Sequence, residues 1–263
     1  MTRLLLILGF LLMVVFLVFD LSFNKQGPPE AQKIITLLPT KTPVPTLGTS
    51  SLVSLDYKAG KLEISWFNVR DINKLKLIPN YQEQKSSDVL FRENNCVFGA
   101  SGGFYDKSNN PLGLTVIDGK AQSQSRTSAL FNGFLWTDSE GNFGIGDTLP
   151  LLKLKYALQS GPLLILNKQI LALKIIDDTE DRRMLAFETN RGLFFASVFH
   201  PDNDLSGPLL ADLPTLLETF AKQKGIEIIN ALNLDGGTAS SFYGNGKILT
   251  EITSIGSFWC EGN

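Results

Sequence analysis

The residues best placed to do chemistry lie at positions 229–243, which read INALNLDGGTASSFY. An apolar run ends at Asp235, and Gly236 and Gly237 follow it directly. A strand that ends in a carboxylate and continues into glycines lets backbone amides approach a bound anion, while the carboxylate faces the same space. A plain Asp-Gly-Gly turn between two strands explains the same residues equally well. The pattern therefore predicts either an anion site around Asp235 or a tight turn.

A second glycine-rich segment, GASGGFY at positions 99–105, follows a predicted strand over residues 96–100. Glycines at the end of a strand let a ligand lie close to the backbone, and they also mark β-bulges and tight corners. Both interpretations stay open for this segment alone.

The single histidine, His200, limits the nucleophilic and metal chemistry open to the chain. Any Ser-His-Asp mechanism must run through it, but a loop histidine before a proline is more often a surface or capping residue. Two cysteines and one histidine are too few for a Cys/His zinc site. Asp202 and Asp204 resemble part of a calcium loop, but no Glu follows at the required spacing. We therefore expect no metal and no cofactor.

The composition indicates a folded domain that does not bind nucleic acid. Apolar residues make up 43% of the chain and include 18 Phe, enough to fill a sizeable core. The 24 Lys and Arg face 26 Asp and Glu, a formal net charge of -2. Because no positive excess is available to hold a polyanion, nucleic acid is not an expected partner.

The amino-terminal part of the chain reads as a membrane segment and a linker. Residues 4–19 are apolar without a charge or a proline, and as a helix they would span about 24 Å. We assign residues 1–23 as a transmembrane anchor or signal segment and favour a single-pass anchor, because no A-x-A-like cleavage site follows. Residues 24–50 hold five of the 12 prolines, which favours an extended spacer. The folded domain, residues 51–263, is then expected on the extracytoplasmic side, or secreted if the segment is cleaved.

Strand patterns dominate the folded part. Apolar residues alternate on both sides of Ala59-Gly60, which predicts a hairpin, and further turns fall at 118–119, 140–141, 190–192 and 244–246. Two helices are predicted, one over about 87–95 and one that Asp212 caps and Gly225 ends. Because strands and helices mix without strict alternation, the predicted fold is α+β, with a large, mainly antiparallel or mixed β-sheet, a few packing helices and the membrane helix before it.

The two cysteines, Cys96 and Cys260, lie near opposite ends of the folded part. A bridge between them is favoured in an oxidising compartment, since it would close a long loop. Two buried, unbridged cysteines are an equally good interpretation.

Five segments, read in order, resemble the phosphodiester glycosidase family. They are GASGGFYDKSNNPLGLTVIDGK, ALQSGPLLIL, DRRMLAF, a helix that ends in KQKG, and ALNLDGG. The resemblance covers about residues 52–258. It implies hydrolysis of a sugar-1-phosphodiester at the anomeric carbon, on a glycan or sugar-phosphate substrate of the cell envelope or the extracellular space.

The resemblance also implies which residues form the site. The arginine of an Arg-Thr-Ala type motif falls on Arg183, and the Leu-Asp-Gly-Gly motif places the catalytic carboxylate at Asp235. The substrate-binding positions that it implies are Ser101, Gly102, Gly103, Phe104, Tyr105, Gly236, Gly237, Thr238 and Ser240. Two positions depart from the family pattern, because Ser101 stands where many members have Asn and Thr238-Ala239 stand where Gly-Ser is common.

The chemistry of such a reaction fits these residue types. A phosphodiester leaving group needs stabilised negative charge more than it needs a proton, and Arg183 and the glycine amides at 102–103 and 236–237 could supply that stabilisation. A carboxylate must then act as nucleophile or as base for water, and Asp235 is the choice. Its partner, if there is one, is expected among Asp106, Asp118 and Glu188.

Two alternatives remain for these assignments. Arg183 follows Arg182 and an acidic run at 177–181, so both arginines could form exposed ion pairs instead. The two departures from the family pattern also leave open a non-catalytic module that binds sugar phosphate or envelope glycan. An active site requires that Arg183, Asp235 and the loop after Ala100 converge on one pocket.

Overall fold

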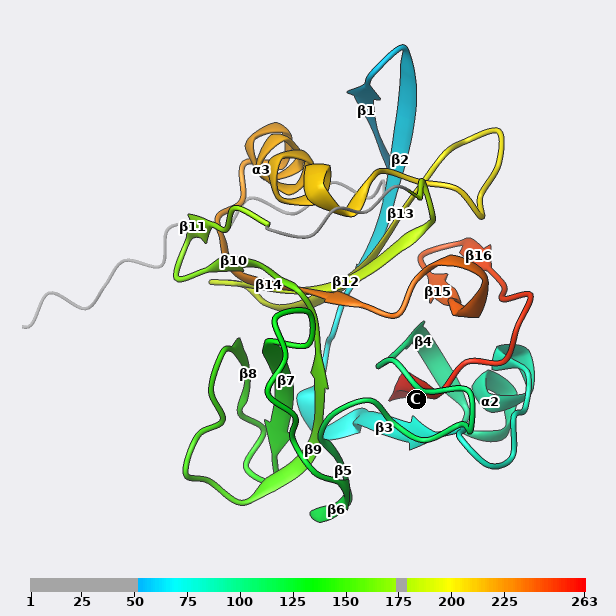
Figure 1. Cartoon of the computed structure of the whole chain (residues 1–263), viewed down its shortest axis with the longest axis vertical. Helices are drawn as coiled ribbons and strands as arrows, with labels where there is room; N and C mark the ends of the chain where they lie inside the picture. Colours follow the sequence, from blue (N-terminus) through cyan, green and yellow to red (C-terminus); the bar gives the residue numbers. More distant parts are fainter. Residues whose placement is uncertain (1–51, 174–178) are drawn as a thin grey trace, which may run out of the picture. The chain divides into compact units, whose positions relative to one another are not determined.

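The computed structural model describes residues 52–173 and 179–263 (Figure 1). The predicted membrane segment at 1–23 and the predicted linker at 24–50 lie outside these residues, so both stay predictions. Across the part of the chain that is described, no helix is long and apolar enough to cross a membrane.

A seven-stranded antiparallel sheet carries the candidate site. Its central strands, β12, β14 and β13, hold mostly apolar residues that point alternately to the two faces of the sheet. In spatial order its strands are β1 (Leu52–Tyr57), β2 (Gly60–Asn68), β13 (Gly192–Phe199), β12 (Arg183–Thr189), β14 (Ile228–Leu234), β10 (Leu163–Leu166) and β11 (Gln169–Ile170).

Two five-stranded sheets complete the β-structure, and every strand pair in them is antiparallel. The order in one is β16 (Lys247–Leu249), β15 (Phe242–Gly244), β4 (Cys96–Ser101), β17 (Ser257–Gly262) and β3 (Leu75–Pro79). The order in the other is β6 (Lys120–Ser123), β5 (Thr115–Ile117), β9 (Leu154–Ser160), β7 (Gly133–Asp138) and β8 (Phe143–Gly146).

The predicted α+β class is confirmed, and three separate antiparallel sheets replace the one large sheet that we expected. Both predicted helices are present as α2 (Ser87–Glu93) and α3 (Leu213–Lys224), and α3 ends at Gly225 in a left-handed conformation, φ 61°. Three short 3-10 helices, η1 (Ile72–Lys74), η2 (Leu210–Asp212) and η3 (Gly237–Ala239), were not predicted.

Asp212 precedes α3 but does not cap it through its side chain. Its carboxylate instead accepts a hydrogen bond of 2.8 Å from the Tyr57 hydroxyl on β1. The predicted side-chain cap is therefore wrong, because a tertiary contact takes the oxygen that would have bonded the first turn of the helix.

The two faces of the seven-stranded sheet support two cores. On one face, Leu185 and Phe187 of β12 pack with the apolar side of α3, where Phe220 meets Trp66 edge to face at 5.1 Å between ring centroids. On the other face, Met184 belongs to a core shared with the two smaller sheets. Each such side chain stabilises the fold by about 1.5–3 kcal/mol when it leaves water. The sheet is therefore buried on both sides, and only the ends of its strands are free to build a site.

A disulfide joins Cys96 on β4 to Cys260 on β17, which confirms the bridged interpretation. The strands are neighbours, and the two Cα atoms lie 5.5 Å apart, within the range that a bridge requires.

Candidate active site

The end of β14 delivers Asp235 to the candidate site. Leu234 is the last residue of the buried strand, and Asp235 follows it at the point where the chain leaves the sheet (Figure 1). The Asp235 N–H donates to the Gly102 carbonyl at 3.0 Å, and the Ser101 hydroxyl donates to the Asp235 carbonyl at 3.1 Å. The two glycine-rich segments that the sequence singled out are thus bonded directly to each other.

A pocket of about 290 Å³ opens beside this junction. Asp235 and Arg183 both line it, and Phe104 from the first glycine-rich segment forms part of its wall. The structure thus brings together the three components that an active site requires. Gly236 and Gly237 line the same pocket.

Burial perturbs the Asp235 carboxyl strongly. Protein surrounds this group on most sides, and the resulting loss of hydration raises its pKa well above the usual value for an aspartate. A hydrogen bond from the Gly236 N–H opposes the shift without cancelling it. The raised pKa makes Asp235 easier to protonate than an ordinary aspartate, so it can hold a proton for donation.

Arg183 is buried and forms part of the wall of the pocket. Its Nε donates to the Pro208 carbonyl at 3.0 Å, and its Nη2 donates to the Thr179 carbonyl at 2.8 Å. The backbone thus fixes the guanidinium group, which places a positive charge in the wall.

Arg182 is fully buried and is not among the residues that line the pocket. Its guanidinium donates to the hydroxyl and the carbonyl of Ser240 and to the carbonyls of Asp204 and Thr250. Burial lowers the pKa of Arg182. This arginine ties three segments together. Both arginines are buried, so the alternative that they lie exposed on the surface is wrong.

Asp181 is a second carboxylate in the pocket, and the sequence did not single it out. Its carboxyl carbon lies 3.6 Å from the position that a Cβ on Gly237 would occupy, so it reaches the loop that follows Asp235. The sequence around Asp181 is acidic and reads as a solvated surface. The pairing of Met184 with Leu234 brings the start of β12 beside the end of β14, and so brings Asp181 near Asp235.

The three carboxylates predicted as partners of Asp235 lie outside the pocket lining. Asp106 accepts from backbone N–H groups of its own loop, at Ser108 and Asn110. Asp118 accepts from the Tyr156 hydroxyl at 2.6 Å, and Glu188 accepts from the Asn230 amide at 2.8 Å. Besides Asp235, the carboxylate that lines this pocket is Asp181.

The glycine amides do not form the anion cradle that we expected. Gly102 N–H donates to the Ser257 carbonyl at 2.9 Å, and Gly103 N–H donates to the Ser257 hydroxyl at 3.1 Å. Gly237 N–H donates to the Arg182 carbonyl at 2.8 Å, and Gly236 N–H donates to the Asp235 carboxyl. Since all four donors have protein partners, these glycines shape the loops, and the positive charge of the pocket comes from Arg183.

The remaining predicted binding residues support the site from outside the pocket lining. Tyr105 donates its hydroxyl to the Ser254 carbonyl, and burial first and the Asp235 charge second raise its pKa. Ser240 is buried, where its hydroxyl accepts from Arg182 and donates to the Gly237 carbonyl at 2.6 Å. Thr238 is exposed and contacts the Thr253 hydroxyl at 3.3 Å.

Asn233 is a further pocket residue that the sequence analysis passed over. Its side-chain N–H donates to the Gly161 carbonyl at 3.0 Å, while its side-chain oxygen is buried and accepts no hydrogen bond. A buried acceptor without a partner costs about 1–3 kcal/mol.

His200 lies away from the pocket lining. Its Nδ1 faces the Lys61 carbonyl at 3.0 Å, just after the last residue of β13 and on the β2 side of the sheet. In the described ranges, no three His, Cys, Asp or Glu side chains gather in the way that a metal site needs.

The comparisons with known proteins decide the family. Residues 94–257 match the phosphodiester glycosidase family, and they include both glycine-rich segments, Asp181, Arg183 and Asp235. The chain belongs to the phosphodiester glycosidase family. No curated protein matches the sequence.

Solved structures with a similar fold include two proteins of low sequence identity to this chain. The catalytic domain of zebrafish N-acetylglucosamine-1-phosphodiester alpha-N-acetylglucosaminidase, auto-inhibited by its pro-peptide, is 16% identical with a TM-score of 0.62, over 81% of each chain. A protein from Synechocystis is 12% identical with a TM-score of 0.53, over 80% of this chain and 61% of the other. At these identities the likeness supports the fold alone.

Proposed function

We propose that this chain hydrolyses a sugar-1-phosphodiester at the anomeric carbon and releases the sugar and a phosphomonoester. The observation that carries the proposal is that Asp235, Asp181 and Arg183 line one pocket inside the family-matched region. Two carboxylates and one fixed cation are the groups that such a reaction needs.

The size of the pocket supports a single sugar ring near the reacting bond. About 290 Å³ lies at the lower end of the range for small-molecule sites, roughly 300–1,000 Å³. Phe104 offers an apolar wall to the ring. This wall would orient the sugar, while Arg183 attracts the phosphate.

The raised pKa of Asp235 favours the part of general acid for this residue, in place of the nucleophile or base that the sequence indicated. A neutral carboxyl does not repel the phosphodiester anion. When the bond between the anomeric carbon and the phosphate oxygen breaks, the leaving phosphate gains a second negative charge. Its second pKa is about 6, so it can accept the Asp235 proton near neutral pH.

Asp181 then serves as the base for water or as the nucleophile. In the single-displacement form, the water oxygen bonds to the anomeric carbon, Asp181 takes the water proton, and Asp235 protonates the departing phosphate. Arg183 stabilises the charge that develops on that phosphate, because a cation acts strongly where water is largely excluded.

We also propose an extracytoplasmic location and an envelope or extracellular glycan as the substrate. The apolar run at 4–19 and the disulfide support this location, since disulfides persist in oxidising compartments. External protease should therefore digest the domain in intact cells. Protection from protease would contradict the location.

A binding module is the second candidate function. The saturated amides of Gly102, Gly103, Gly236 and Gly237 favour it, because a pocket without amide donors stabilises developing charge less well. Such a module would bind sugar phosphate without turning it over.

The test is hydrolysis of N-acetylglucosamine-1-phosphodiester and glucose-1-phosphodiester substrates in ¹⁸O-labelled water. A glycosidase places the label in the released sugar, whereas a phosphodiesterase places it in the phosphate. Asp235→Asn should abolish turnover, and the exposed Asp202→Asn serves as a matched control that should retain it. Label in the phosphate, or saturable binding with no turnover, would overturn the proposal, and the second result would favour the binding module.

A further inference from the structure

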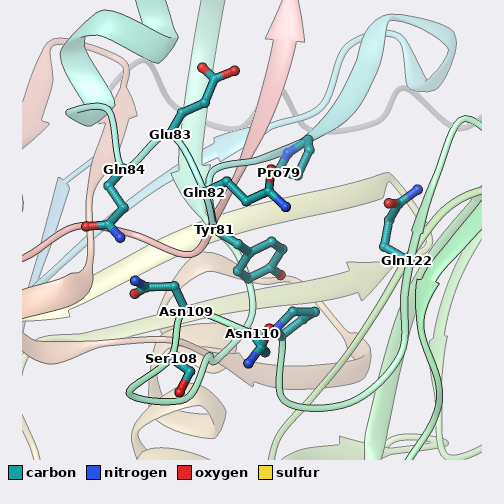
Figure 2. A pocket seen from close by; sticks show the side chains of 10 residues that line it. Pro79, Tyr81, Gln82, Glu83, Gln84, Ser108, Asn109, Asn110 and Gln122 are labelled. Atoms are coloured by element: carbon teal, nitrogen blue, oxygen red, sulfur yellow. The ribbon is translucent and has the colours of Figure 1, made fainter.

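A second and larger pocket lies beside the candidate active site. Its volume is about 650 Å³, and three separate segments line it. They are the turn between β3 and α2 with Tyr81 and Gln82, the loop at 108–111, and Gln122 on β6. Figure 2 shows these side chains around the cavity.

The two pockets share a wall. The loop at 104–112 presents Phe104 to the smaller pocket and Pro111 to the larger one, and Tyr105 pairs with Pro111 across this loop. Gly256 lies between Tyr81 and Tyr105, because a Cβ there would be 2.9 Å from the Tyr81 ring and 2.6 Å from the Tyr105 ring. A ligand longer than one sugar could therefore extend from one pocket to the other.

The electrostatics agree with this proximity. After burial, which is the first cause, the charge that Asp235 carries when it is ionised contributes to the raised pKa of both Tyr81 and Tyr105. The ring that walls the larger pocket thus lies within electrostatic reach of the proposed acid.

The lining of the larger pocket is rich in side-chain amides. Each amide both donates and accepts hydrogen bonds, which matches the hydroxyl groups of a sugar. In Figure 2 the Tyr81 ring projects among them, and the rings of Pro79 and Pro111 add apolar surface that suits the C–H faces of a sugar ring. The amide-bearing residues are Gln82, Gln84, Asn109, Asn110 and Gln122.

The charges of the lining select against an anion. Glu83 is its one charged residue, and Lys85 pairs with that carboxylate at 2.8 Å. No arginine or lysine lines the pocket, so a phosphate or a carboxylate would find no cation there. The lining therefore fits a neutral ligand.

The loop that carries Asn109 is held in shape before any ligand arrives. The Asp106 carboxylate accepts from the N–H groups of Ser108 at 2.8 Å and Asn110 at 2.9 Å. Asn109 adopts a left-handed conformation, φ 58°, between them. A fixed wall binds with a smaller loss of loop entropy.

We propose that the larger pocket binds a neutral oligosaccharide, the glycan that continues from the reacting sugar or from its phosphate. This inference rests on the proposed function, since it assigns the pocket to the same substrate. Binding energy from this remote part of the substrate can then be used at the reacting bond, so an extended substrate should react with a higher kcat/KM than a minimal one.

The test uses the full chain and neutral tetrasaccharides of glucose and of N-acetylglucosamine, which contain no phosphodiester and cannot be turned over. Calorimetry measures their affinity for the wild type, for Gln82→Ala/Asn109→Gly and for Gln223→Ala. Glycine at 109 keeps the left-handed backbone, and Gln223 lies on α3 outside the pocket, which makes its variant a matched control.

We expect a tetrasaccharide to bind the wild type and the control equally, and to bind the double variant about tenfold more weakly because two hydrogen bonds are lost. No binding by either tetrasaccharide, or equal affinity for the double variant at an unchanged melting temperature, would overturn the inference. The ¹⁸O assay tests the proposed function separately. If the protein shows no turnover but binds the tetrasaccharide through Gln82 and Asn109, the larger pocket is a glycan site and the proposed hydrolase activity is wrong.

Discussion

At the scale of single residues, the raised pKa of Asp235 lowers the stability of the folded chain at high pH and also lets the residue hold a proton for the reaction. Its folded-state pKa is raised, so the folded chain binds a proton more tightly than the unfolded chain does. The stability that this proton gives is complete below the unfolded pKa and is lost as the pH rises through the folded pKa. A group that only shaped a turn would not need to be held in this environment.

The first prediction at this scale is that Asp235→Asn separates stability from turnover. Asparagine has a similar shape and cannot ionise, so above the raised pKa the variant should melt at a higher temperature than the wild type. Turnover should fall by roughly 10²–10⁴-fold, the usual contribution of a general acid. Calorimetric melting between pH 5 and pH 9, with kcat at each pH, measures both effects.

For the wild type, kcat should decline on the alkaline side as Asp235 loses its proton, and this limb should be missing from any residual activity of the variant. A purely structural Asp-Gly-Gly turn gives the opposite pattern, because the melting temperature and the activity would then fall together at every pH.

At the scale of elements, the sequence predicted most of what is local. The hairpin β1–β2 follows from apolar residues that alternate on both sides of a short turn, and its register agrees with that alternation. The hairpins β12–β13 and β15–β16 follow from their turn residues at 190–192 and 244–246. Strands β3 and β17 were not predicted, because they pair with each other across distant parts of the chain. In addition, the residues of β17 are nearly all buried, so β17 has no alternating apolar pattern.

The candidate site also has a part that local sequence motifs predict and a part that only the structure reveals. Asp235, Arg183 and Phe104 follow from motifs, and the structure brings them to one pocket. Asp181 and the unpartnered oxygen of Asn233 depend on long-range pairing and on burial, which no local pattern contains. The saturation of the glycine amides was unpredictable for the same reason, since Ser257 comes from the opposite end of the folded part.

The prediction at this scale concerns the turn that follows β14. A Cβ on Gly236 would lie 2.5 Å from the Arg182 carbonyl, a backbone atom that cannot move aside without shifting β12. Gly236→Ala should therefore displace the Asp235 loop, lower the melting temperature by several degrees and reduce turnover at least tenfold.

Gly60→Ala is the matched control. Its added Cβ would have no neighbour closer than 4.0 Å, and its backbone φ is not positive. It should leave the melting temperature and turnover near the wild-type values. Equal effects of the two substitutions would show that the close approach of Gly236 to β12 is not what places Asp235.

At the scale of the whole domain, the disulfide connects stability to the site. Cys96 and Cys260 are separated by 164 residues, so their bridge restricts the unfolded chain over most of the domain. The same two strands serve the pocket, because β4 continues into Ser101 and Gly102, and Ser257 at the start of β17 accepts from the Gly102 and Gly103 amides. Loosening this pair of strands should therefore affect Asp235 through the Gly102 carbonyl.

The last prediction follows from that connection. Removing the bridge with Cys96→Ala/Cys260→Ala should lower the free energy of unfolding by about 4–5 kcal/mol in the chain-entropy description, since the closed loop is long. Denaturant unfolding measures this change. Dithiothreitol should destabilise the wild type to a similar extent and reduce its turnover. It should have no further effect on the double variant. This comparison separates loss of the bridge from other effects of the reductant. If the double variant unfolds at the wild-type denaturant concentration with full turnover, the bridge neither supports the domain nor holds the two strands that position Asp235.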